Sequence, residues 1–457
     1  MDKKENLPIV IYGGPLFDGL NTVYEDGAVY IANGKIEMVG DESEVFPQIT
    51  NTEQVEIYDT QGKVIFPGLI NLHHHFYAAL AKGLSPVAPI TNFEECLEQF
   101  WWRFDRALDP EAIQLAALLS LLDCIRSGVT TIFDHHSSPS NVKGSLDNIA
   151  AVVERSGLRA CLCYEISDRN GPKTFQNGLE ENLAFIESHR DSRRLRGILG
   201  LHANFTLSEK SIAEIAQYYN PEIGIHIHCA EDKIDGEFCR ELGYNGPVSR
   251  LKHFGLLGKK SLLAHGVHLD QAELTEVGQS GSIIVHNPES NANNAVGRLD
   301  LPPAVEIPIG LGTDGITSAM LATCRAGYLA QRQAGIAHAQ ILDYLPQCLF
   351  KTNFTFASQF FGFKLGQIVP GAAADIAVFD YIPVTPLNSD NIYRHIIYGM
   401  AYARAVMVMV EGQQIYADGA FLTLDEELIH EEARQASQRV WEKFKKSDTN
   451  NFKQPEI

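Results

Sequence analysis

The sequence predicts an α/β protein with a (β/α)8 barrel and a small β-sandwich domain that both chain ends build together. Three observations support this prediction. The chain has 457 residues, which is more than one ordinary domain needs but suits a barrel of about 250 residues or more with a small addition. Its middle alternates short apolar runs with helical patterns. Its two ends share another pattern, in which period-2 runs are broken by glycine turns.

The barrel is expected over residues 67–365. Strands that alternate with helical stretches are typical of βα units, which form parallel sheets. The clearest helical patterns cover residues 110–128 and 145–157. The eight strand candidates are 64–73, 130–136, 159–165, 196–205, 223–229, 261–268, 282–288 and 307–314. In a (β/α)8 barrel the active site lies where the strands end.

The two chain ends are expected to pair. Residues 1–66 and 366–424 carry similar β-runs and turns, so we assign them to one discontinuous domain. Residues 425–457 are left as a charged helix with an apolar stripe over 425–446, followed by a short disordered end. The stripe suits packing on the body of the protein or on another subunit, which leaves a homo-oligomer open.

Composition narrows the classes of partner. Lys plus Arg number 37 and Asp plus Glu number 57, and the net charge of −20 disfavours nucleic acid and anionic membranes as partners. The N-terminus lacks the apolar region of a signal peptide, and no apolar run reaches the ~18 residues that span a bilayer. The 8 cysteines are scattered without a C-x-x-C pair. We therefore expect a cytoplasmic protein with reduced thiols.

The first candidate metal ligands stand in an internal run of three histidines. Residues two apart on a strand point to the same face, so His73 and His75 can share one metal while His74 points away. Neutral imidazoles are preferred ligands of divalent metals such as zinc. A triple histidine is rare outside metal sites and tags. We therefore predict metal binding for His73 and His75, and packing for His74.

Two further strand ends offer histidines in pairs. His226 and His228 share one face of a strand, and His265 and His268 follow in the next, but spacing does not decide which of each pair is a ligand. Glu231 comes three residues after His228. A carboxylate there, close to a metal-bound water, is suited to proton transfer. The alternative is an exposed glutamate at a helix start, stabilised by the helix dipole.

The last two strand ends add a histidine and an aspartate. His286 opens the polar turn HNPES, and beside a metal it is suited to polarise a substrate oxygen or to help deprotonate water. Asp314 lies in the segment GTDG and is suited to bind a metal and accept the nucleophile's proton. Its alternative role is that of an ordinary turn aspartate.

The order of these motifs resembles the amidohydrolase superfamily. The segments are PGLINLHHH (67–75), HIHCAE (226–231), AHGVH (264–268), HNPESNANNAVG (286–297) and GTDG (312–315), followed by LGQIVPGAAADIAVFD (365–380). The pattern is similar to the branch of cytosine deaminases, guanine deaminases and triazine hydrolases. Within it, segments 133–140, 159–171 and 200–208 are most similar to the SsnA-type aminohydrolases. The resemblance covers nearly the whole chain.

The resemblance chooses among the histidines that spacing leaves open. The metal ligands that it implies are His73, His75, His228, His265 and Asp314. It also implies Glu231 as the general acid and base and His286 as an active-site histidine. Dinuclear members carry a carboxylated lysine at the end of strand four, where this chain has His202. We therefore expect one divalent metal, zinc by default with iron as the alternative.

The implied reaction is the deamination of a nitrogen heterocycle, such as a purine, pyrimidine or triazine, by metal-activated water. Asp314 and His286 are expected to orient and deprotonate the water, and Glu231 to protonate the ring nitrogen and then the departing amine. Six polar residues at predicted strand ends are candidate substrate contacts: His135, His136, Glu165, Arg169, His202 and Asn204.

Two other hypotheses stay open. The same residues suit the hydrolysis of a cyclic amide, a ureido group or a halogenated ring, although Glu231 favours deamination because a leaving amine needs a proton. A non-catalytic barrel that serves as a scaffold should have lost ligands. This chain keeps all the ligand positions that the resemblance implies, together with Glu231 and His286.

Overall fold

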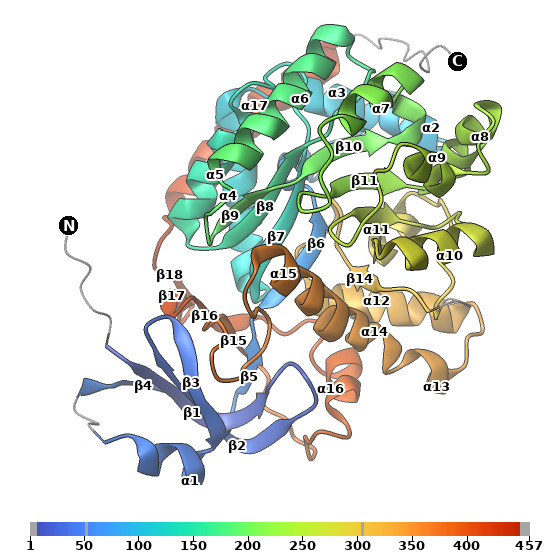
Figure 1. The fold of residues 1–457 in the computed structure, drawn as a ribbon. Helices are drawn as coiled ribbons and strands as arrows, with labels where there is room; N and C mark the ends of the chain where they lie inside the picture. Colours follow the sequence, from blue (N-terminus) through green and yellow to red (C-terminus); the bar gives the residue numbers. More distant parts are fainter. Residues whose placement is uncertain (1–6, 51–53, 303–305, 448–457) are drawn as a thin grey trace.

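Parallel strands form the middle of the chain in the computed structural model, which describes residues 7–50, 54–302 and 306–447 (Figure 1). They lie in two sheets. The first contains, in order, β6 (Leu69–His74), β7 (Val129–His136), β8 (Arg159–Tyr164) and β9 (Leu195–Gly197). The second contains β10 (Leu199–Ala203), β11 (Ile225–Cys229), β12 (Leu262–His265), β13 (Ile283–His286) and β14 (Ile309–Leu311). Nearly all of their residues are buried, as expected for strands that are covered on both faces.

Single bridges join the two parallel sheets at both edges. Ile166, just after β8, bridges Leu201 of β10, and His74 of β6 bridges Asp314 beyond β14. Neighbouring strands therefore follow the chain order, as βα units require. The predicted α/β class with parallel strands is confirmed, but the strands form two linked sheets and not one continuous ladder. One division falls inside the strand candidate 196–205, where residue 198 separates β9 from β10.

Helices cover the outside of the parallel strands (Figure 1). The helices predicted at 110–128 and 145–157 are confirmed as α4 (Pro110–Arg126) and α5 (Ser145–Ser156). Asp109 caps α4 by accepting a hydrogen bond from the backbone of Ala112. The other helices of this part are α2 (Phe93–Cys96), α3 (Trp102–Ala107), α6 (Pro172–Ser188), α7 (Glu209–Ala216), α8 (Lys233–Glu241), α9 (Pro247–His253), α10 (Gln271–Ser280), α11 (Pro288–Asn293), α12 (Met320–Gln333), α13 (His338–Ile341), α14 (Tyr344–Gln347) and α15 (Phe354–Phe361).

Both chain ends enter one further sheet of nine strands. Its strands are β1 (Ile9–Phe17), β2 (Val23–Ala32), β3 (Lys35–Asp41), β4 (Glu56–Asp59), β5 (Val64–Pro67), β15 (Ile376–Phe379), β16 (Ala405–Val410), β17 (Gln413–Ala417) and β18 (Ala420–Phe421). The path runs β18-β17-β16-β15-β5-β1-β2-β3, with β4 paired to β1. The predicted pairing of the two ends is confirmed. In the described residues its hydrogen bonds form one sheet, where a two-sheet sandwich was expected.

The antiparallel pair β5 and β15 joins the early and late parts of that sheet. The strand candidate 64–73 is therefore divided, because β5 belongs to the chain-end sheet and β6 to the parallel strands. A separate buried cluster contains Ile11, Ile65 and Met407 from the two chain ends. Short helices α1 (Glu42–Val45) and α16 (Ile392–Tyr398) complete these parts. The predicted domain boundaries at 66/67 and 365/366 stay a prediction.

The charged helix predicted near the C-terminus is α17 (Glu426–Lys446). Trp441 Nε1 donates a hydrogen bond to Leu80 O at 2.8 Å, and Lys443 Nζ lies 2.6 Å from Asp109 Oδ2. The apolar stripe thus packs on the body of the chain, the first of the two alternatives. The disordered end predicted after this helix, at 448–457, lies outside the described residues. A membrane-crossing helix is not found in the described part of the chain, since every helix there is too short or too polar.

Candidate metal centre and active site

Metal-ligand side chains from four strand ends meet at the carboxyl edge of the parallel strands. Two groups of donor atoms share His73, and the atoms of each group lie within 4.8 Å of one another. One group adds His75 and His228, and the other adds His265 and Asp314. His265 and Asp314 have φ angles of 76° and 51°, in the left-handed region that is costly for residues other than glycine. Such strain is typical of functional sites.

The four imidazoles are oriented by contacts at Nδ1. The partners are His226 Nε2 at 2.8 Å for His73, His135 O at 2.5 Å for His75, His202 O at 2.8 Å for His228 and Asn291 Oδ1 at 2.7 Å for His265. A carbonyl or amide oxygen only accepts, so Nδ1 of the last three histidines carries the proton. In the neutral rings that bind a metal, the Nε2 atoms of these three histidines therefore carry the lone pair that faces the cluster. Hydrogen bonds of this kind orient histidines around bound metals.

Two buried nitrogen atoms test whether the cluster fits a metal. Nε2 of His73 and Nε2 of His265 are buried and make no hydrogen bond with any residue that the structure describes. A buried polar atom without a partner is unfavourable. Neutral imidazoles and one carboxylate are also the donor set of zinc and iron sites. The residues present therefore fit a divalent metal ion.

Asp314 is the carboxylate of this cluster. Its Oδ1 lies 3.0 Å from His75 Nε2, and its Oδ2 accepts a hydrogen bond of 2.6 Å from Ser290 Oγ. Although burial opposes charge, the hydrogen bond and charge of His75 hold the pKa of Asp314 well below its usual range. In turn, Asp314 raises the pKa of His75 to about 9 against the effect of burial. Asp314 is thus an ionised carboxylate whose lone pairs point into the cluster.

Glu231 lies beside the ligand cluster. Its Oε2 is 3.5 Å from His265 Nε2, and its Oε1 accepts a hydrogen bond from Asn294 at 3.1 Å. The side chain is only 11% exposed, and α8 is capped by Asp232, so an exposed position at the helix start is not what the structure shows. Burial raises the pKa of Glu231, and the charge of Asp314 adds to the increase. A carboxyl group that holds its proton more strongly is suited to general acid catalysis.

The second histidine of each open pair lies outside the two donor groups. His226 Nε2 contacts His73 Nδ1, so this residue stands behind the cluster. His268 Nε2 lies 2.7 Å from Val296 O and donates to that carbonyl. The structure thus places His228 and His265, as the resemblance implied, among the grouped donors. His74, predicted to point away, contacts Ser120 Oγ at 2.6 Å.

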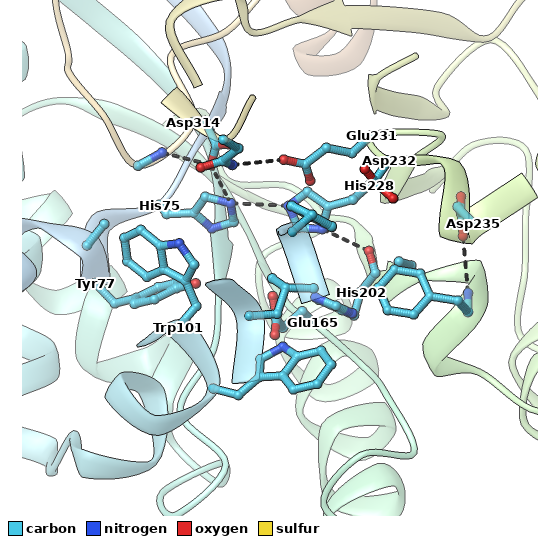
Figure 2. Close-up of a pocket in the computed structure, with 18 residues that line it drawn as sticks. His75, Tyr77, Trp101, Glu165, His202, His228, Glu231, Asp232, Asp235 and Asp314 are labelled. Atoms are coloured by element: carbon cyan, nitrogen blue, oxygen red, sulfur yellow. Dashed lines mark hydrogen bonds and ion pairs between the residues drawn. The ribbon is translucent and has the colours of Figure 1, made fainter. Parts of the chain in front are cut away.

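A cavity opens beside the cluster (Figure 2). It encloses about 680 Å³ of empty space, part of it open to solvent. Its aromatic walls are Tyr77, Phe93, Trp101, Trp102 and Phe205. On the side of the cluster it is lined by His75, His228, Glu231 and Asp314. Planar aromatic walls beside polar groups suit a flat heterocyclic ligand.

His286 lies apart from the two donor groups. The side chain is buried, lies outside both donor groups and lines a second cavity together with Arg298 and Gln333. Neither ring nitrogen has a hydrogen-bond partner among the described residues, and burial lowers its pKa to about 3. The chain turns into α11 directly after β13, so Ser290 of that helix contacts the cluster and His286 does not. Its predicted role in deprotonating water gains no support from this position.

A model of the amidohydrolase family matches residues 64–415, which is most of the chain and includes every grouped donor. The chain belongs to the amidohydrolase family. The sequence resemblance to this superfamily is therefore confirmed.

Curated relatives of this amidohydrolase are deaminases of purine compounds. A 5-methylthioadenosine/S-adenosylhomocysteine deaminase of Thermococcus onnurineus is 29% identical over 437 residues, which covers 93% of this chain and 96% of the relative. An 8-oxoguanine deaminase of Pseudomonas aeruginosa is 29% identical over 398 residues, covering 80% of this chain and 85% of the relative. The alignments span nearly the full length of these proteins.

Solved structures share the fold of this amidohydrolase. An adenosine deaminase from Xanthomonas campestris with bound zinc has a TM-score of 0.79 at 20% identity and covers 94% of this chain and 98% of its own. Guanine deaminase from E. coli has a TM-score of 0.75 at 21% identity, with coverage of 90% and 99%. Triazine hydrolase from Arthrobacter aurescens has a TM-score of 0.78 at 21% identity, with coverage of 94% and 99%. These neighbours show that the chain shares their fold.

The six predicted substrate contacts divide into two sets. Glu165 and His202 line the cavity of this amidohydrolase. The other four do not line it and are bonded to neighbouring groups: His135 to Leu201 O, His136 to Ser138, Arg169 to Asp105 and Glu165, and Asn204 to Asp235. Their contacts position other residues, and direct contact with a substrate stays a prediction for them.

Several residues of the site were not identified from the sequence. Ser290, Asn291 and Asn294 contact Asp314, His265 and Glu231 respectively. All three belong to the motif HNPESNANNAVG, so the motif held the signal, but only its histidine was selected. Trp101 and Trp102 line the cavity from a segment that no strand-end argument reaches.

Proposed function

We propose that this amidohydrolase is a metal-dependent aminohydrolase that removes an amino group from a nitrogen heterocycle of the purine, pyrimidine or triazine type. The observation that carries the proposal is Glu231. A mostly buried carboxyl group with a raised pKa stands 3.5 Å from His265 at the edge of the donor cluster. This is where an acid is needed if the leaving group is an amine. The deaminase names of the relatives support the same reaction.

We further propose one divalent metal, held by His73, His75, His228, His265 and Asp314. The zinc in the adenosine deaminase neighbour supports zinc, and iron is the alternative because imidazole and carboxylate ligands suit both. The metal would lower the pKa of a water molecule towards neutrality and so supply the nucleophile. The domain division at 66/67 and 365/366 belongs to this proposal, with the site at the carboxyl ends of the strands of the larger part.

The residues of the chain then have distinct tasks. Asp314, ionised and fixed by Ser290, accepts the proton that the attacking water loses. Glu231 donates its proton to the ring nitrogen beside the attacked carbon. It then takes a proton from the new hydroxyl group as the carbonyl forms and passes it to the departing amine, and the proton held by Asp314 finally restores Glu231. Tyr77 and Trp101 flank the cavity and restrict the plane of the ring, which holds the reacting carbon in a fixed orientation (Figure 2).

We also propose that the enzyme works in the cytoplasm on uncharged small molecules. All eight cysteines are unpaired, in keeping with a reducing compartment. A net charge of −20 disfavours nucleic acid as a partner. A homo-oligomer stays a hypothesis that sedimentation of the purified protein tests directly.

The test is an ammonia assay with zinc-loaded protein and a panel of aminopurines, aminopyrimidines and aminotriazines. We expect ammonia from at least one of them. In Glu231→Gln, kcat should fall by about 10²- to 10⁴-fold because the acid is lost, while the metal content stays unchanged. Glu237→Gln, an exposed glutamate on α8, is the matched control and should keep full activity.

Three outcomes would contradict the proposal. The first is the appearance of ring-opened acids without ammonia when cyclic amides and ureido compounds are included, because it would make the enzyme a hydrolase of those groups. The second is the loss of halide from a halogenated ring without ammonia, because it would assign the site to dehalogenation. The third is full turnover in Glu231→Gln, because it would remove the residue on which deamination rests.

A further inference from the structure

The substrate cavity is acidic on several sides. Five carboxylates line it: Glu165, Glu231, Asp232, Asp235 and Asp314. Within the described residues, neither a lysine nor an arginine lines this cavity. Acidic side chains on several sides disfavour negative charge on the parts of a ligand that lie away from the proposed metal ion. A substrate that carries a carboxylate or a phosphate group therefore finds no cationic partner here.

Arg169 lies behind Glu165 and is already neutralised. Its Nη2 donates to Asp105 Oδ2 and, at 2.7 Å, to Glu165 Oε1. The guanidinium also lies over the ring of Trp102, 5.4 Å from its centre. The side chain of Arg169 is only 2% exposed. It fixes Glu165 in place and does not reach the ligand space itself.

Glu165 keeps one oxygen for a ligand. While Oε1 accepts from Arg169, Oε2 lies 3.6 Å from His135 Nδ1, which is too far for a hydrogen bond. His135 Nε2 already lies 3.1 Å from Leu201 O, so it carries the ring proton and leaves Nδ1 as an acceptor in the neutral ring. The ion pair with Arg169 keeps the Glu165 carboxyl group ionised. Oε2 is thus an acceptor for which the described residues supply no hydrogen-bond donor.

His202 supplies a second acceptor. Its Nδ1 lies 2.9 Å from Thr206 Oγ1, and that hydroxyl donates its single proton to Ala203 O at 3.0 Å. The hydroxyl can therefore only accept from His202, so Nδ1 carries the proton and Nε2 is a bare acceptor. Figure 2 shows His202 and Glu165 close together on one side of the cavity.

The acceptor pair lies close to the reacting centre. A carboxylate oxygen of Glu165 lies within 4.8 Å of a ring nitrogen of His228, one of the grouped metal donors. In Figure 2 Glu165 lies on the other side of His75 and His228 from Asp314. A distance this short is spanned by the ring system that carries the reacting carbon. Groups that bind Glu165 therefore belong to the heterocycle and not to a distant substituent.

A second metal ion is a weaker explanation of these acceptors. His135, Glu165 and His228 also form a group of donor atoms within 4.8 Å of one another. However, His228 Nδ1 contacts His202 O at 2.8 Å, and its Nε2 faces His75 Nε2 at 3.2 Å in the first cluster. Neither nitrogen of His228 is left for another ion.

We propose that Glu165 and His202 are specificity-determining residues that accept two hydrogen bonds from ring N–H groups of the substrate. The substrate class is an uncharged heterocycle with two N–H donors on the edge remote from the amino group that is lost. This inference rests on the proposed deamination. An 8-oxopurine base has such an edge, because N7–H and N9–H flank the C8 carbonyl. Analogues with a phosphate or carboxylate group are excluded by the acidic cavity.

The test measures binding by titration calorimetry with zinc-loaded protein, so it does not require turnover. We compare 8-oxoguanine with 9-methyl-8-oxoguanine, in which one donor is blocked, for the wild type and Glu165→Gln. Loss of a hydrogen bond to a charged group should weaken 8-oxoguanine binding by about 10- to 100-fold in the variant. 7-Methyl-8-oxoguanine is compared alongside, so that each donor is blocked in turn. Methylation of the donor that binds Glu165 should weaken binding to the wild type, but much less in the variant, because the two changes remove the same interaction.

The matched control is Glu209→Gln. Glu209 pairs with Arg250 at 2.9 Å, and it does not line the cavity. The variant therefore removes a carboxylate from another arginine and leaves the ligand space unchanged. It should bind all of these bases as the wild type does. Equal losses for all of them in Glu165→Gln would indicate a merely structural role and would overturn the inference.

The outcomes separate this inference from the proposed function. If 8-oxoguanine binds with the expected coupling but no panel compound releases ammonia, the deaminase proposal fails and the acceptor pair stands. If ammonia is released but Glu165→Gln binds like the wild type, the acceptor pair fails. Failure of 8-oxoguanine to bind, or tighter binding of 8-oxoguanosine 5′-monophosphate, overturns it. The inference is also overturned if the wild type binds a second zinc ion per chain and Glu165→Gln loses that ion.

Discussion

Two buried clusters of arginine and carboxylate stand at opposite ends of β8. At the amino end, Arg159 donates to Asp375 and lies 3.8 Å from Glu411 Oε1. At the carboxyl end, Arg169 follows the strand and donates to Asp105 and Glu165. The side chains of both arginines are almost inaccessible, at 0% and 2% exposure. The ion-pair chemistry is the same at both ends, so the surroundings must decide what each cluster does.

The surroundings differ in what they connect. Asp375 precedes β15 and Glu411 separates β16 from β17, so the amino-end cluster ties the chain-end sheet to the parallel strands. Glu165, by contrast, lines the substrate cavity beside the metal-ligand cluster. In α/β barrels the carboxyl ends of strands carry function and the amino ends carry stability. We therefore expect mutations at the two ends to separate activity from folding.

The largest effect is expected at the carboxyl end, in Asp314→Asn. The change removes the charge that the cluster offers to the metal and the base that accepts the water's proton. We expect kcat to fall by about 10⁴-fold or more, together with weaker zinc retention. The metal-free protein should lose only the stability that the pair of His75 and Asp314 contributes. Full turnover with normal zinc content would show that the site is assigned wrongly.

The opposite result is expected at the amino end, in Arg159→Met. The change leaves Asp375 and Glu411 without their buried partner, which should lower the free energy of unfolding by about 3–5 kcal/mol. Urea unfolding measures this loss, and kcat per folded, zinc-loaded molecule should stay near the wild-type value. Arg159→Lys keeps the charge and should lose less. An unchanged unfolding midpoint in Arg159→Met would show that the amino-end cluster does not stabilise the fold.

The amino-acid sequence predicts the metal ligands at the carboxyl ends of the strands better than it predicts the residues around them. His73 and His75 follow from strand alternation, because two residues apart on a strand must face the same side. The choice of His228 over His226 does not follow from alternation, since both share one face. It depends on how far along the strand the cluster lies, which the resemblance supplied and the donor groups match.

What the sequence could not predict depends on helix and loop geometry. The role predicted for His286 stays a prediction, whereas Ser290 and Asn291, which the sequence did not single out, contact the cluster because α11 starts directly after β13. The division of the strand candidate 64–73 has a similar origin. One apolar run serves two sheets, because its first half pairs with β15, hundreds of residues later, and such pairing has no local signal.

The smallest expected effect is a pH dependence of zinc binding, which concerns the carboxyl ends of the strands and not the amino-end cluster. His75 must be neutral to bind a metal, but in the metal-free protein Asp314 raises its pKa to about 9. Zinc binding therefore displaces one proton, and the zinc affinity should increase about tenfold per pH unit between pH 7 and 9. Competition with a chelator of known affinity at pH 7, 8 and 9 measures this slope. His268→Gln, outside the donor groups, should keep it.

The raised pKa of His75 also makes the stability of the metal-free protein depend on pH. The folded pKa of His75 is above the unfolded value of about 6.5, so its pairing with Asp314 stabilises the fold fully below pH 6.5. That stabilisation should disappear as the pH rises through 9, and bound zinc should remove the dependence. Arg159 stays charged throughout this range, so its cluster adds no such slope. A zinc affinity that is flat from pH 7 to 9 would mean that His75 is already neutral, and that Asp314 does not hold its proton.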